Sequence, residues 1–425
     1  MTRLSRLLEL TRLNKLSRRE LIVAGSAAGA VLLIGGGIVA VAWPSDSSSS
    51  KPPASAGPSI PVVPPEPSIP DITDDPTDPP STPATTGPTD TKSPDEPDDE
   101  GNDDGKRKPA DAPLIANAAP AGQGPLPNSA PVSCPEATVT VTDTKSLEEA
   151  LAKATPGASI ALEDGKYTGK FVTQASGTAE QPIWLCGGAG AVLDGDSVKG
   201  GYVLHLNKAK YWRLVGFTVT NGQKGVMADT TVGSVVQGLT VHDIGDEAIH
   251  LRANSTDNVV LNNTISKTGL RRDKFGEGVY IGSAVSNWCT TNDCQPDRSD
   301  RNVVKGNKMS EVTSEAIDIK EGTTGGLLEG NTFDGSGLKG ADSWVDVKGN
   351  NYLIKGNMGT KSTQDGFQTH QILKGWGDHN VFTGNIATVD GPGLAIALRQ
   401  PASNVVACDN KFTAAGEGLS NIPCR

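Results

Sequence analysis

The chain has 425 residues, enough for two or three ordinary domains, but its 29 prolines and its net charge of −11 are spread unevenly. Residues 1–43 carry +4 and residues 44–131 carry −10, which leaves −5 for the rest of the chain. Most of the acidity therefore belongs to one proline-rich stretch. The mildly acidic remainder excludes a general nucleic-acid binder, which needs a basic surface.

The N-terminal residues have the pattern of a membrane-targeting segment. Residues 1–20 are basic, and residues 21–43 are uncharged and apolar over a length that spans a bilayer core. Basic residues stay in the cytoplasm, so the chain after Trp43 is expected outside. Two interpretations are open: residues 21–43 are a retained transmembrane anchor, or they are a signal peptide cleaved near Ala40-Val41-Ala42.

The same segment indicates where the protein is found. Arg18 and Arg19 lie in a stretch that resembles a twin-arginine export signal, which is a bacterial address. A retained anchor predicts a bacterial membrane protein with an extracellular C-terminal domain. A cleaved signal predicts a secreted one.

Residues 44–132 have the composition of a disordered linker. They hold 22 of the 29 prolines, together with many Ser, Thr, Asp and Gly residues. Such a segment cannot bury enough apolar surface to offset the entropy of its chain. Extended polyproline structure, at about 3.1 Å per residue, would make it a spacer between membrane and domain. Recognition of a partner is the alternative role.

All six cysteines lie in residues 133–425. An even number of cysteines in an exported chain indicates disulfides. One pair is separated by five residues, a second would fasten the C-terminus, and the third pair is what remains. The expected pairs are Cys134–Cys186, Cys289–Cys294 and Cys408–Cys424. A zinc site is the alternative, but the sequence has no CxxC pair or histidine-rich cluster to support it.

A short apolar strand followed by Gly-Asn recurs along residues 133–425, mostly every 22 to 28 residues. Clear copies are Asn302-Val-Val-Lys-Gly-Asn307, Gly326-Leu-Leu-Glu-Gly-Asn331 and Tyr352-Leu-Ile-Lys-Gly-Asn357. A fixed period of this length indicates a solenoid. Short β-branched strands without long amphipathic runs predict an all-β fold, a right-handed parallel β-helix. Stacked asparagines at the turns would hydrogen-bond from coil to coil.

Residues 145–154 carry a helical pattern before the first strands. Ser146 is the expected N-cap, and Leu147, Ala150 and Leu151 form one apolar face. A helix at this place would cover the open end of the solenoid, which an exposed strand edge requires.

The second strand of each later coil carries the candidate functional residues. Alternation with a period of two turns one set of side chains inward and leaves two outward ladders on coils about 4.8 Å apart. The first ladder consists of His250, Tyr280, Asp318, Asp346 and Gln368. The second consists of Arg252, Gly282, Lys320, Lys348, His370 and Arg399. A strip of acids therefore lies beside a strip of bases that suits an acidic polysaccharide.

Three glutamates, Glu247, Glu277 and Glu315, begin successive strands of this kind. Stacked carboxylates repel one another unless a cation or a basic side chain lies among them. Two interpretations are open: solvated turn glutamates with lysine neighbours, or a Ca²⁺ site, since hard oxygen ligands suit that ion.

Two insertions fall at the same side of the coils. Residues 283–300 contain Trp288, and residues 374–378 contain Trp376. Loops that lengthen on one side of a solenoid usually wall its binding surface. Trp288, Trp344, Trp376 and Tyr280 would then stack on sugar rings, with ordinary packing as the alternative for each.

Together these features resemble the chondroitinase B and alginate lyase family of β-helix polysaccharide lyases, over roughly residues 138–360. In that family a calcium-binding Glu is followed five residues later by a catalytic Lys, and Glu315 and Lys320 match this pair. Two positions depart from the pattern. Thr313 stands where the family has a second Glu, and Lys348 stands in the turn where the family has its catalytic Arg.

The resemblance implies calcium-assisted β-elimination on a uronate-containing polysaccharide. Lys320 would take the proton and Lys348 would help to neutralise the sugar carboxylate. The expected metal ligands are Glu315, Glu277, Asp318 and Asp346. The expected substrate contacts are Arg252, His250, Tyr280, Trp344, His370, Trp376 and Arg399.

Two other functions remain open. One is a non-catalytic, wall-bound domain that binds glycan, which the missing arginine favours. The other is a glycoside hydrolase with Asp318 and Asp346 as the acid and base. In each case the partner is an acidic polysaccharide rather than a nucleic acid, and a monomer is expected.

Overall fold

A computed structural model describes residues 124–399 and 403–425. The expected cytoplasmic segment 1–20, the membrane segment 21–43 and the linker up to residue 123 lie outside the described residues. Within the described ranges, no helix is both long enough and apolar enough to span a membrane.

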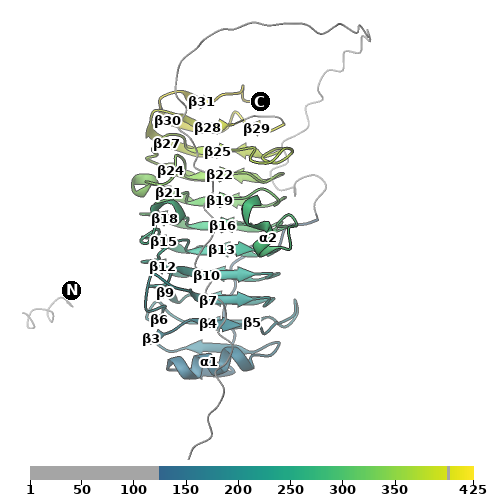
Figure 1. Ribbon diagram of the computed structural model, residues 1–425, viewed down its shortest axis with the longest axis vertical. Coiled ribbons are helices and arrows are strands. Elements are labelled where there is room, and N and C mark those ends of the chain that lie inside the picture. Colours follow the sequence, from purple (N-terminus) through teal and green to yellow (C-terminus); the bar gives the residue numbers. More distant parts are fainter. Residues whose placement is uncertain (1–123, 400–402) are drawn as a thin grey trace, which may run out of the picture. The chain divides into compact units, whose positions relative to one another are not determined.

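The described residues form a right-handed parallel β-solenoid of about ten turns (Figure 1). Each full turn adds one strand to each of three parallel sheets, which we call A, B and C. This geometry explains the repeat in the sequence, because one period of the sequence is one turn of the solenoid. The predicted all-β parallel β-helix is therefore confirmed.

Sheet A has 11 strands and sheets B and C have 10 each. Sheet A contains β1 (Val139–Val141), β2 (Ser159–Leu162), β5 (Ile183–Cys186), β8 (Trp212–Val215), β11 (Val235–Gln237), β14 (Val259–Leu261), β17 (Val303–Lys305), β20 (Leu327–Glu329), β23 (Leu353–Lys355), β26 (Val381–Thr383) and β29 (Val405–Val406). Sheet B contains β3 (Gly165–Thr168), β6 (Ala191–Asp194), β9 (Thr218–Thr220), β12 (Thr240–His242), β15 (Thr264–Ser266), β18 (Lys308–Ser310), β21 (Thr332–Asp334), β24 (Met358–Thr360), β27 (Ile386–Gly391) and β30 (Lys411–Ala415). Sheet C contains β4 (Phe171–Thr173), β7 (Tyr202–Asn207), β10 (Lys224–Asp229), β13 (Ile249–Arg252), β16 (Val279–Ile281), β19 (Ile317–Ile319), β22 (Val345–Val347), β25 (Phe367–Thr369), β28 (Leu394–Leu398) and β31 (Gly418–Ser420).

The core runs along the inside of the solenoid. The first and last residues of the short sheet C strands point inward, as the alternation predicts, and Val279, Ile281, Ile317 and Ile319 are fully buried. The central residue of the strands therefore faces outward, which places the ladders of candidate residues on the outer face of sheet C.

Asparagines at the turns between sheets A and B form the predicted ladder. Asn307 is fully buried, and its Oδ1 accepts hydrogen bonds from the backbone N–H and the side-chain Nδ2 of Asn263, both at 2.9 Å. Its Nδ2 donates to Val260 O and to Asn331 Oδ1. Gly306 before it has φ +66°, a left-handed turn conformation that glycine adopts without strain.

Helix α1 (Thr144–Lys153) covers the N-terminal end of the solenoid (Figure 1). Leu147 and Leu151 are buried against the core, which confirms the apolar face. The predicted N-cap is wrong by three residues: Asp143 is the cap, because its side chain accepts from Ser146 N at 2.7 Å. Ser146 instead closes the capping box from the third helical position.

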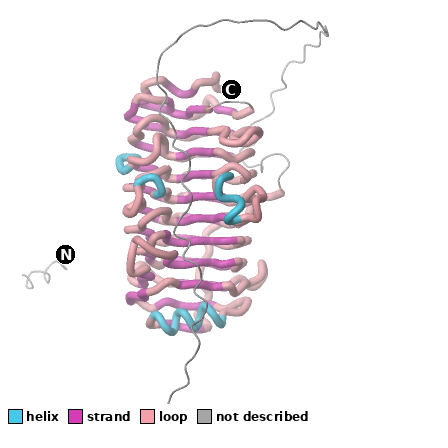
Figure 2. Tube along the Cα trace, viewed as in Figure 1, coloured by secondary structure: helices cyan, strands magenta, loops and turns pink. Residues whose placement is uncertain are grey.

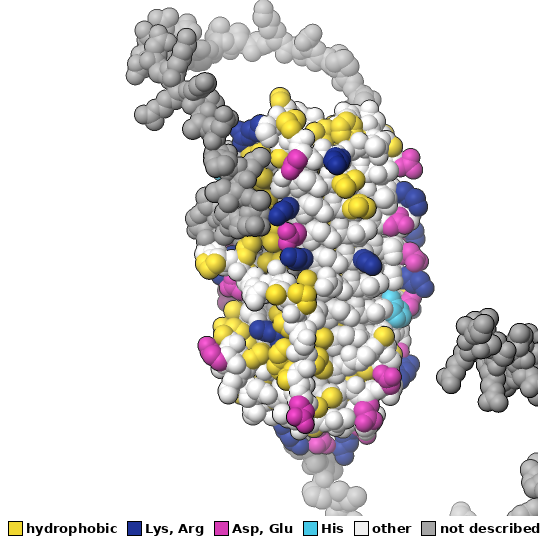
Figure 3. Space-filling model, turned by 180° about the vertical axis from the view of Figure 1, so that it is seen from behind, with side chains coloured by type: hydrophobic (Ala, Val, Ile, Leu, Met, Phe, Trp, Pro, Cys, Tyr) yellow, Lys and Arg dark blue, Asp and Glu magenta, His cyan; other side chains and the backbone are white. Residues whose placement is uncertain are grey.

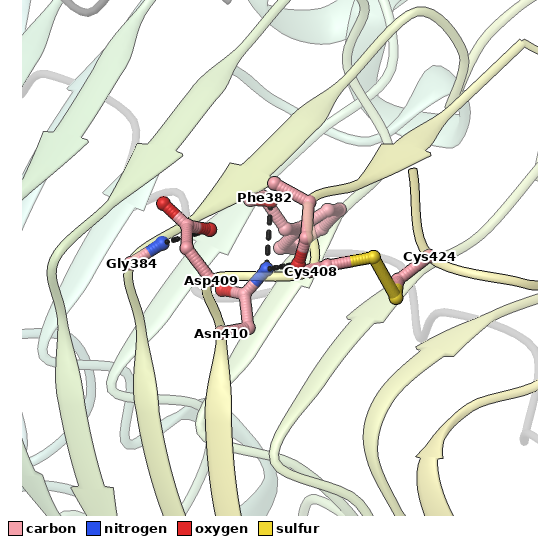
Figure 4. Close-up of a disulfide and its surroundings, with 7 residues drawn as sticks. Phe382, Gly384, Cys408, Asp409, Asn410 and Cys424 are labelled. Carbon is pink, nitrogen blue, oxygen red and sulfur yellow. Dashed lines mark hydrogen bonds between the residues drawn. A yellow bond between two sulfur atoms is a disulfide. The ribbon is translucent and has the colours of Figure 1, made fainter.

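All three expected disulfides are present. They join Cys134 to Cys186, Cys289 to Cys294 and Cys408 to Cys424. Figure 4 shows the last of these beside the final asparagine turn, where Asn410 Nδ2 donates to Phe382 O at 2.9 Å. Three disulfides indicate a domain that folds in an oxidising compartment outside the cytoplasm.

The end of the expected linker belongs to the folded body. Leu126 and Val132 pack on apolar residues of the outer face of sheet A, and Val132 exchanges two hydrogen bonds with the side chain of Gln237. Viewed from behind Figure 1, the surface carries apolar side chains and only scattered charged ones (Figure 3).

Short helical turns lie on both sides of the central strands (Figure 2). On one side, η1 (Asp273–Phe275) precedes β16 and η3 (Gly335–Gly337) precedes β22. On the other side, η2 (Val285–Asn287) and α2 (Trp288–Thr291) follow β16 in the predicted insertion. These loops flank the outer face of sheet C, which carries the candidate residues.

Candidate active site

The outward ladders of sheet C lie as the sequence predicts. Strands β13, β16, β19, β22 and β25 pair in register, so the members of the first ladder are lateral neighbours from His250 to Gln368. Figure 1 shows this sheet facing the viewer. An outward position is nevertheless not an exposed one: Asp318 is 1 % accessible and Gln368 is inaccessible.

Three carboxylates form a cluster at the centre of this face, which we call the acid cluster. One oxygen from each of Glu277, Glu315 and Asp318 lies within 4.8 Å of the others. Residues 124–399 and 403–425 contain no other such group of three Asp, Glu, His or Cys side chains. Glu277 and Asp318 are buried and Glu315 is half-buried.

Burial and mutual repulsion act on the acid cluster. Burial raises the pKa of Glu277 well above its usual range, and the charges of Glu247, Glu315 and Asp318 raise that pKa further. Burial is also the main cause that raises the pKa of Glu315, followed by the charge of Asp318. Crowded carboxyls of this kind favour either protonation or a bound positive charge.

The donor set of the acid cluster fits a divalent cation. Carboxylate oxygens are hard ligands that suit Ca²⁺. Oε2 of Glu277 is buried without a hydrogen-bond partner, and Ser314 contacts the cluster through a 2.6 Å hydrogen bond to Glu315 Oε2. Glu277, Glu315 and Asp318 are thus the expected metal ligands that the structure brings together.

Two lysines lie directly beside the acid cluster. Nζ of Lys320 is 2.9 Å from Asp318, and Nζ of Lys348 is 2.8 Å from both Asp318 and Asp346. Burial lowers the pKa of Lys348, but the two aspartates outweigh burial and hold that pKa above its usual range. Lys348 therefore carries a fixed positive charge on this face.

Asp346, the fourth expected metal ligand, is not part of the acid cluster. Its carboxylate bonds Lys348 and also His370 Nδ1, at 2.9 Å. Burial raises the pKa of Asp346, but Lys348 and His370 outweigh burial and lower it. Burial likewise opposes the charged form of His370, yet Asp346 raises the pKa of that imidazole. Asp346 therefore pairs with the basic residues of the second ladder and does not belong to the acid cluster.

The ladder continues on the N-terminal side with His250 and Tyr280. Their rings meet edge to face with centroids 4.3 Å apart, and Nζ of Lys320 lies 5.1 Å from the centroid of the Tyr280 ring. Arg252 is held by Asp229, with 2.7 Å between Nε and Oδ1. Of the substrate contacts expected from these coils, Tyr280 therefore lies beside Lys320, and His250 and Arg252 lie one coil further toward the N-terminal end.

The prediction that Trp344 binds sugar is wrong. Its side chain is fully buried, its ring packs edge-on against Phe367, and its Nε1 donates to Lys361 O at 2.8 Å. The residue precedes β22, where the strict alternation of the strand does not yet apply, so the side chain turns into the core.

The other expected aromatic and basic contacts lie on the C-terminal side. Trp376 is half-buried in the loop after β25, and the guanidinium of Arg298 lies 5.7 Å from its ring centroid. The two insertions therefore meet each other, which supports a common wall. Arg399 pairs with the buried Asp365 and keeps 43 % of its side chain accessible.

Some residues that line the cavity on this face were not singled out from the sequence. A cavity of about 30 Å³ lies over β13 and β16, and Lys274, Phe275 and Asn287 line it together with members of the ladders. The sequence did contain one signal for them: Lys274 and Phe275, a basic residue beside an aromatic one, lie in the loop before β16.

Comparison with solved structures identifies the class of protein. An alginate lyase from Paenibacillus sp. str. FPU-7 matches with a TM-score of 0.63 and 38 % identity, over 67 % of this chain and 99 % of that chain. Pectate lyase Pel9A matches with a TM-score of 0.48 and 14 % identity, over 66 % and 80 % of the two chains. The surface adhesin PfbA of Streptococcus pneumoniae matches with a TM-score of 0.46 and 11 % identity, over 63 % and 74 %.

The chain belongs to the right-handed parallel β-helix polysaccharide lyases of the chondroitinase B and alginate lyase type. The alginate lyase is its relative along nearly the whole length of that enzyme. No protein-family model matches the sequence, and no curated protein matches it either.

Proposed function

We propose that this protein is an exported, cell-surface lyase that cleaves a uronate-containing polysaccharide by calcium-assisted β-elimination. The observation that carries the proposal is the acid cluster, a place for a divalent cation within one coil of Lys320 and Lys348. Membership in the same family as an alginate lyase supports it. The export signal and anchor of residues 21–43 are part of the proposal and lie outside the described residues.

The acid cluster supplies the cation site. Glu277, Glu315 and Asp318 would hold Ca²⁺, which when bound neutralises the sugar carboxylate and so makes the neighbouring C–H more acidic. Lys348 adds a second positive charge to the same carboxylate. It takes the place of the arginine that the family pattern has at this turn, but as a point charge without a bidentate fork.

Lys320 is the proposed general base. The proton leaves C5 of the uronate, the bond from C4 to the glycosidic oxygen breaks, a C4–C5 double bond forms, and the departing oxygen takes up one proton. An amine accepts a proton only in its neutral form. Lys320 lies 2.9 Å from Asp318, so the role requires Asp318 to be engaged by the cation rather than by the lysine.

The remaining basic side chains position the polymer. Arg252, His370 and Arg399 follow the second ladder along the face, on both sides of the lysines. Their charges are paired by Asp229 at the end of β10, by Asp346 of the first ladder and by Asp365 before β25, and each keeps part of its surface accessible. A chain of uronates could therefore lie along sheet C, across successive coils.

Incubation of the protein with alginate, chondroitin and pectate tests the proposal. The ultraviolet absorbance of the unsaturated uronate should rise with one of them, and a calcium chelator should abolish the rise. Lys320→Ala should be inactive, whereas Lys308→Ala, which removes an exposed lysine of sheet B, should match the native protein. No rise with any polymer, with or without calcium, would contradict the lyase assignment.

A non-catalytic glycan-binding domain is the second candidate. The favouring observation is the network itself, in which Lys348 bridges Asp318 and Asp346 and so makes a stable charged ladder. Under this alternative the chain binds a uronate polymer and releases no unsaturated product. A hydrolase that uses Asp318 and Asp346 is less well supported, because both carboxylates are bonded to lysine.

A further inference from the structure

A column of apolar side chains runs along the outer face of sheet A, on a different side of the solenoid from sheet C. Its members begin seven strands that pair in register, and the residue after each of them points into the core. Contiguous apolar surface of this kind usually marks a place where something binds. We call it the apolar column, and its members are Val235, Val259, Val303, Leu327, Leu353, Val381 and Val405.

The chain itself covers the first part of the apolar column. Cys134 is bonded to Cys186 at the end of β5, and two residues earlier Val132 exchanges two hydrogen bonds with the side chain of Gln237 in β11. Leu126 packs on the same column, so residues 124–132 form a strap that lies across several coils. The column members nearest to the strap are 6 %, 2 % and 0 % accessible, in the order Val235, Val259 and Val303.

The described part of the chain leaves the other members of the column less well covered. They occupy the same position in their strands as the buried valines, yet all four are half-buried: Leu327, Leu353, Val381 and Val405. On one side the column is bordered by ion pairs, in which Glu329 lies 2.8 Å from Lys305 and 3.4 Å from Lys355. Because those charges are already paired, the strip between them suits an uncharged, apolar occupant.

The segment directly before the strap has the composition of such an occupant. Every charged residue between residues 44 and 132 precedes residue 112, so residues 112–132 are uncharged throughout. Leu114 and Ile115 are the last large apolar residues before Leu126. A stretch without charges can cover apolar surface without the cost of removing an ion from water.

The chain between these residues is long enough to reach the uncovered members. Strands β20 and β29 are three coils apart, which is about 14 Å at a spacing of about 4.8 Å per coil. Ile115 precedes Leu126 by eleven residues. In extended polyproline form, at about 3.1 Å per residue, those residues span up to about 34 Å. Leu114 and Ile115 can therefore lie on any of the last three coils of sheet A.

We infer that residues 113–123 continue the strap over the C-terminal part of the apolar column, with Leu114 and Ile115 as its anchors. The occupant is a segment of the same chain, in continuity with the packing that Leu126 already makes. The linker then leaves the domain at its C-terminal coils, and only the charged residues before position 112 act as a spacer. The inference does not depend on the proposed lyase activity.

Hydroxyl-radical footprinting of the full chain in lipid nanodiscs tests the inference, because the oxidation rate of a side chain follows its accessibility. In the double variant Leu114→Ser/Ile115→Ser, the oxidation rates of Leu353 and Val381 should each rise about twofold or more, as apolar area returns to water. The same rates in the native protein should not depend on protein concentration. A rate that falls as the concentration rises would mean that a second copy covers the column, and would overturn the inference.

The matched control is Val62→Ser/Val63→Ser, which removes an apolar pair from the charged part of the linker and should leave every rate unchanged. Two side chains report the fold within each protein. Val259, which is 2 % accessible, should stay slow, and Phe412, which is 42 % accessible, should stay fast. If both references are intact and the column is oxidised equally in Leu114→Ser/Ile115→Ser and in the native protein, the strap ends near residue 124.

Photocrosslinking identifies the occupant without disturbing the anchors. Benzoylphenylalanine in place of Ala116 should crosslink to the outer face of sheet A between β20 and β29. In an equal mixture of unlabelled and isotope-labelled chains, every such crosslink should lie within one chain. Crosslinks between the two kinds of chain would place a second copy on the column, and crosslinks to another face would place residues 113–123 elsewhere. Either result would contradict the extended strap.

Discussion

Replacement of Glu277 by Gln tests the electrostatics of the acid cluster most directly. The variant keeps the shape of the side chain and removes a carboxylate that lies within 4.8 Å of Glu315 and Asp318. Burial, then the charges of Glu247, Glu315 and Asp318, raise the pKa of Glu277 well above its ordinary value of 4.5. The folded protein therefore keeps a proton on Glu277 that the unfolded chain releases.

The sign of the effect follows from this difference in protonation. Below pH 4.5 Glu277 is protonated in both states and contributes nothing to the pH dependence of unfolding. As the pH rises further, the unfolded chain ionises while folded Glu277 stays protonated, so the stability of the native protein falls. Glu277→Gln has no such loss, so its advantage over the native protein should grow from about zero at pH 4 upward.

The distance between the carboxylates sets the scale of the advantage. Two unit charges 4.8 Å apart repel by about 3 kcal/mol at an effective dielectric constant of about 20. The relief of one such repulsion sets the scale of the gain at alkaline pH, on the order of 3 kcal/mol. In a domain of this size about 2 °C per kcal/mol is expected, or roughly 6 °C in Tm.

Thermal unfolding of both proteins between pH 4 and pH 9, with chelator and with calcium, measures the effect. Calcium at a hundred times its dissociation constant should add about 2.7 kcal/mol to the native protein and much less to Glu277→Gln. Glu329→Gln is the matched control, because Lys305 and Lys355 lower the pKa of Glu329 and its removal should cost stability slightly. A Glu277→Gln variant that is destabilised at every pH, with the native response to calcium, would refute the reasoning.

Three further predictions concern the frame of the site. Asn307→Ala leaves buried hydrogen-bond partners unpaired in both neighbouring turns. It should therefore destabilise the domain by about 2–5 kcal/mol in denaturant unfolding. A variant as stable as the native protein would contradict the role of the asparagine ladder. Trp344→Ala should cost about 3–5 kcal/mol of stability, because the side chain is fully buried. The fraction of the variant that folds should bind oligouronates with unchanged affinity. A loss of affinity without a loss of stability would place Trp344 on the surface instead. Asp346→Asn should lower the pKa of His370 in a proton NMR titration, because Asp346 is what raises it, and an unchanged pKa would show that the contact is absent.

The fold could be predicted because its cause is local and repeated. Each period contains the same apolar strand and the same Gly-Asn turn, so one turn implies the next, and the register of Asp318 and Asp346 follows from aligning the copies. The pairing of the cysteines did not follow from the period: six cysteines permit fifteen pairings, and it is the structure that shows the expected set. Residues outside the period were harder to place, as Asp143 and Ser146 at the helix start show, because several side chains there can cap the same backbone groups.

The sequence predicts which residues lie on the face of the candidate site, but it does not predict which of their side chains contact one another. The sequence brought Glu277, Glu315 and Asp318 to one face, yet it also offered Asp346 as an equal ligand. Only the side-chain packing assigns Asp346 to Lys348 and His370. The choice depends on distances of a few ångströms between coils, which no periodicity specifies.

What the sequence determined by itself is the solenoid, its direction of alternation and the chemical character of one face. Hydrophobic period and turn chemistry act within one coil and its neighbours, so they can be read along the chain. What only the tertiary structure decided is which outward residues are buried, which carboxylates form the acid cluster, and which loop residues line the cavity over β13. Those features depend on segments that lie far apart in sequence, such as Trp376 against Arg298, and they arise only when the coils are stacked.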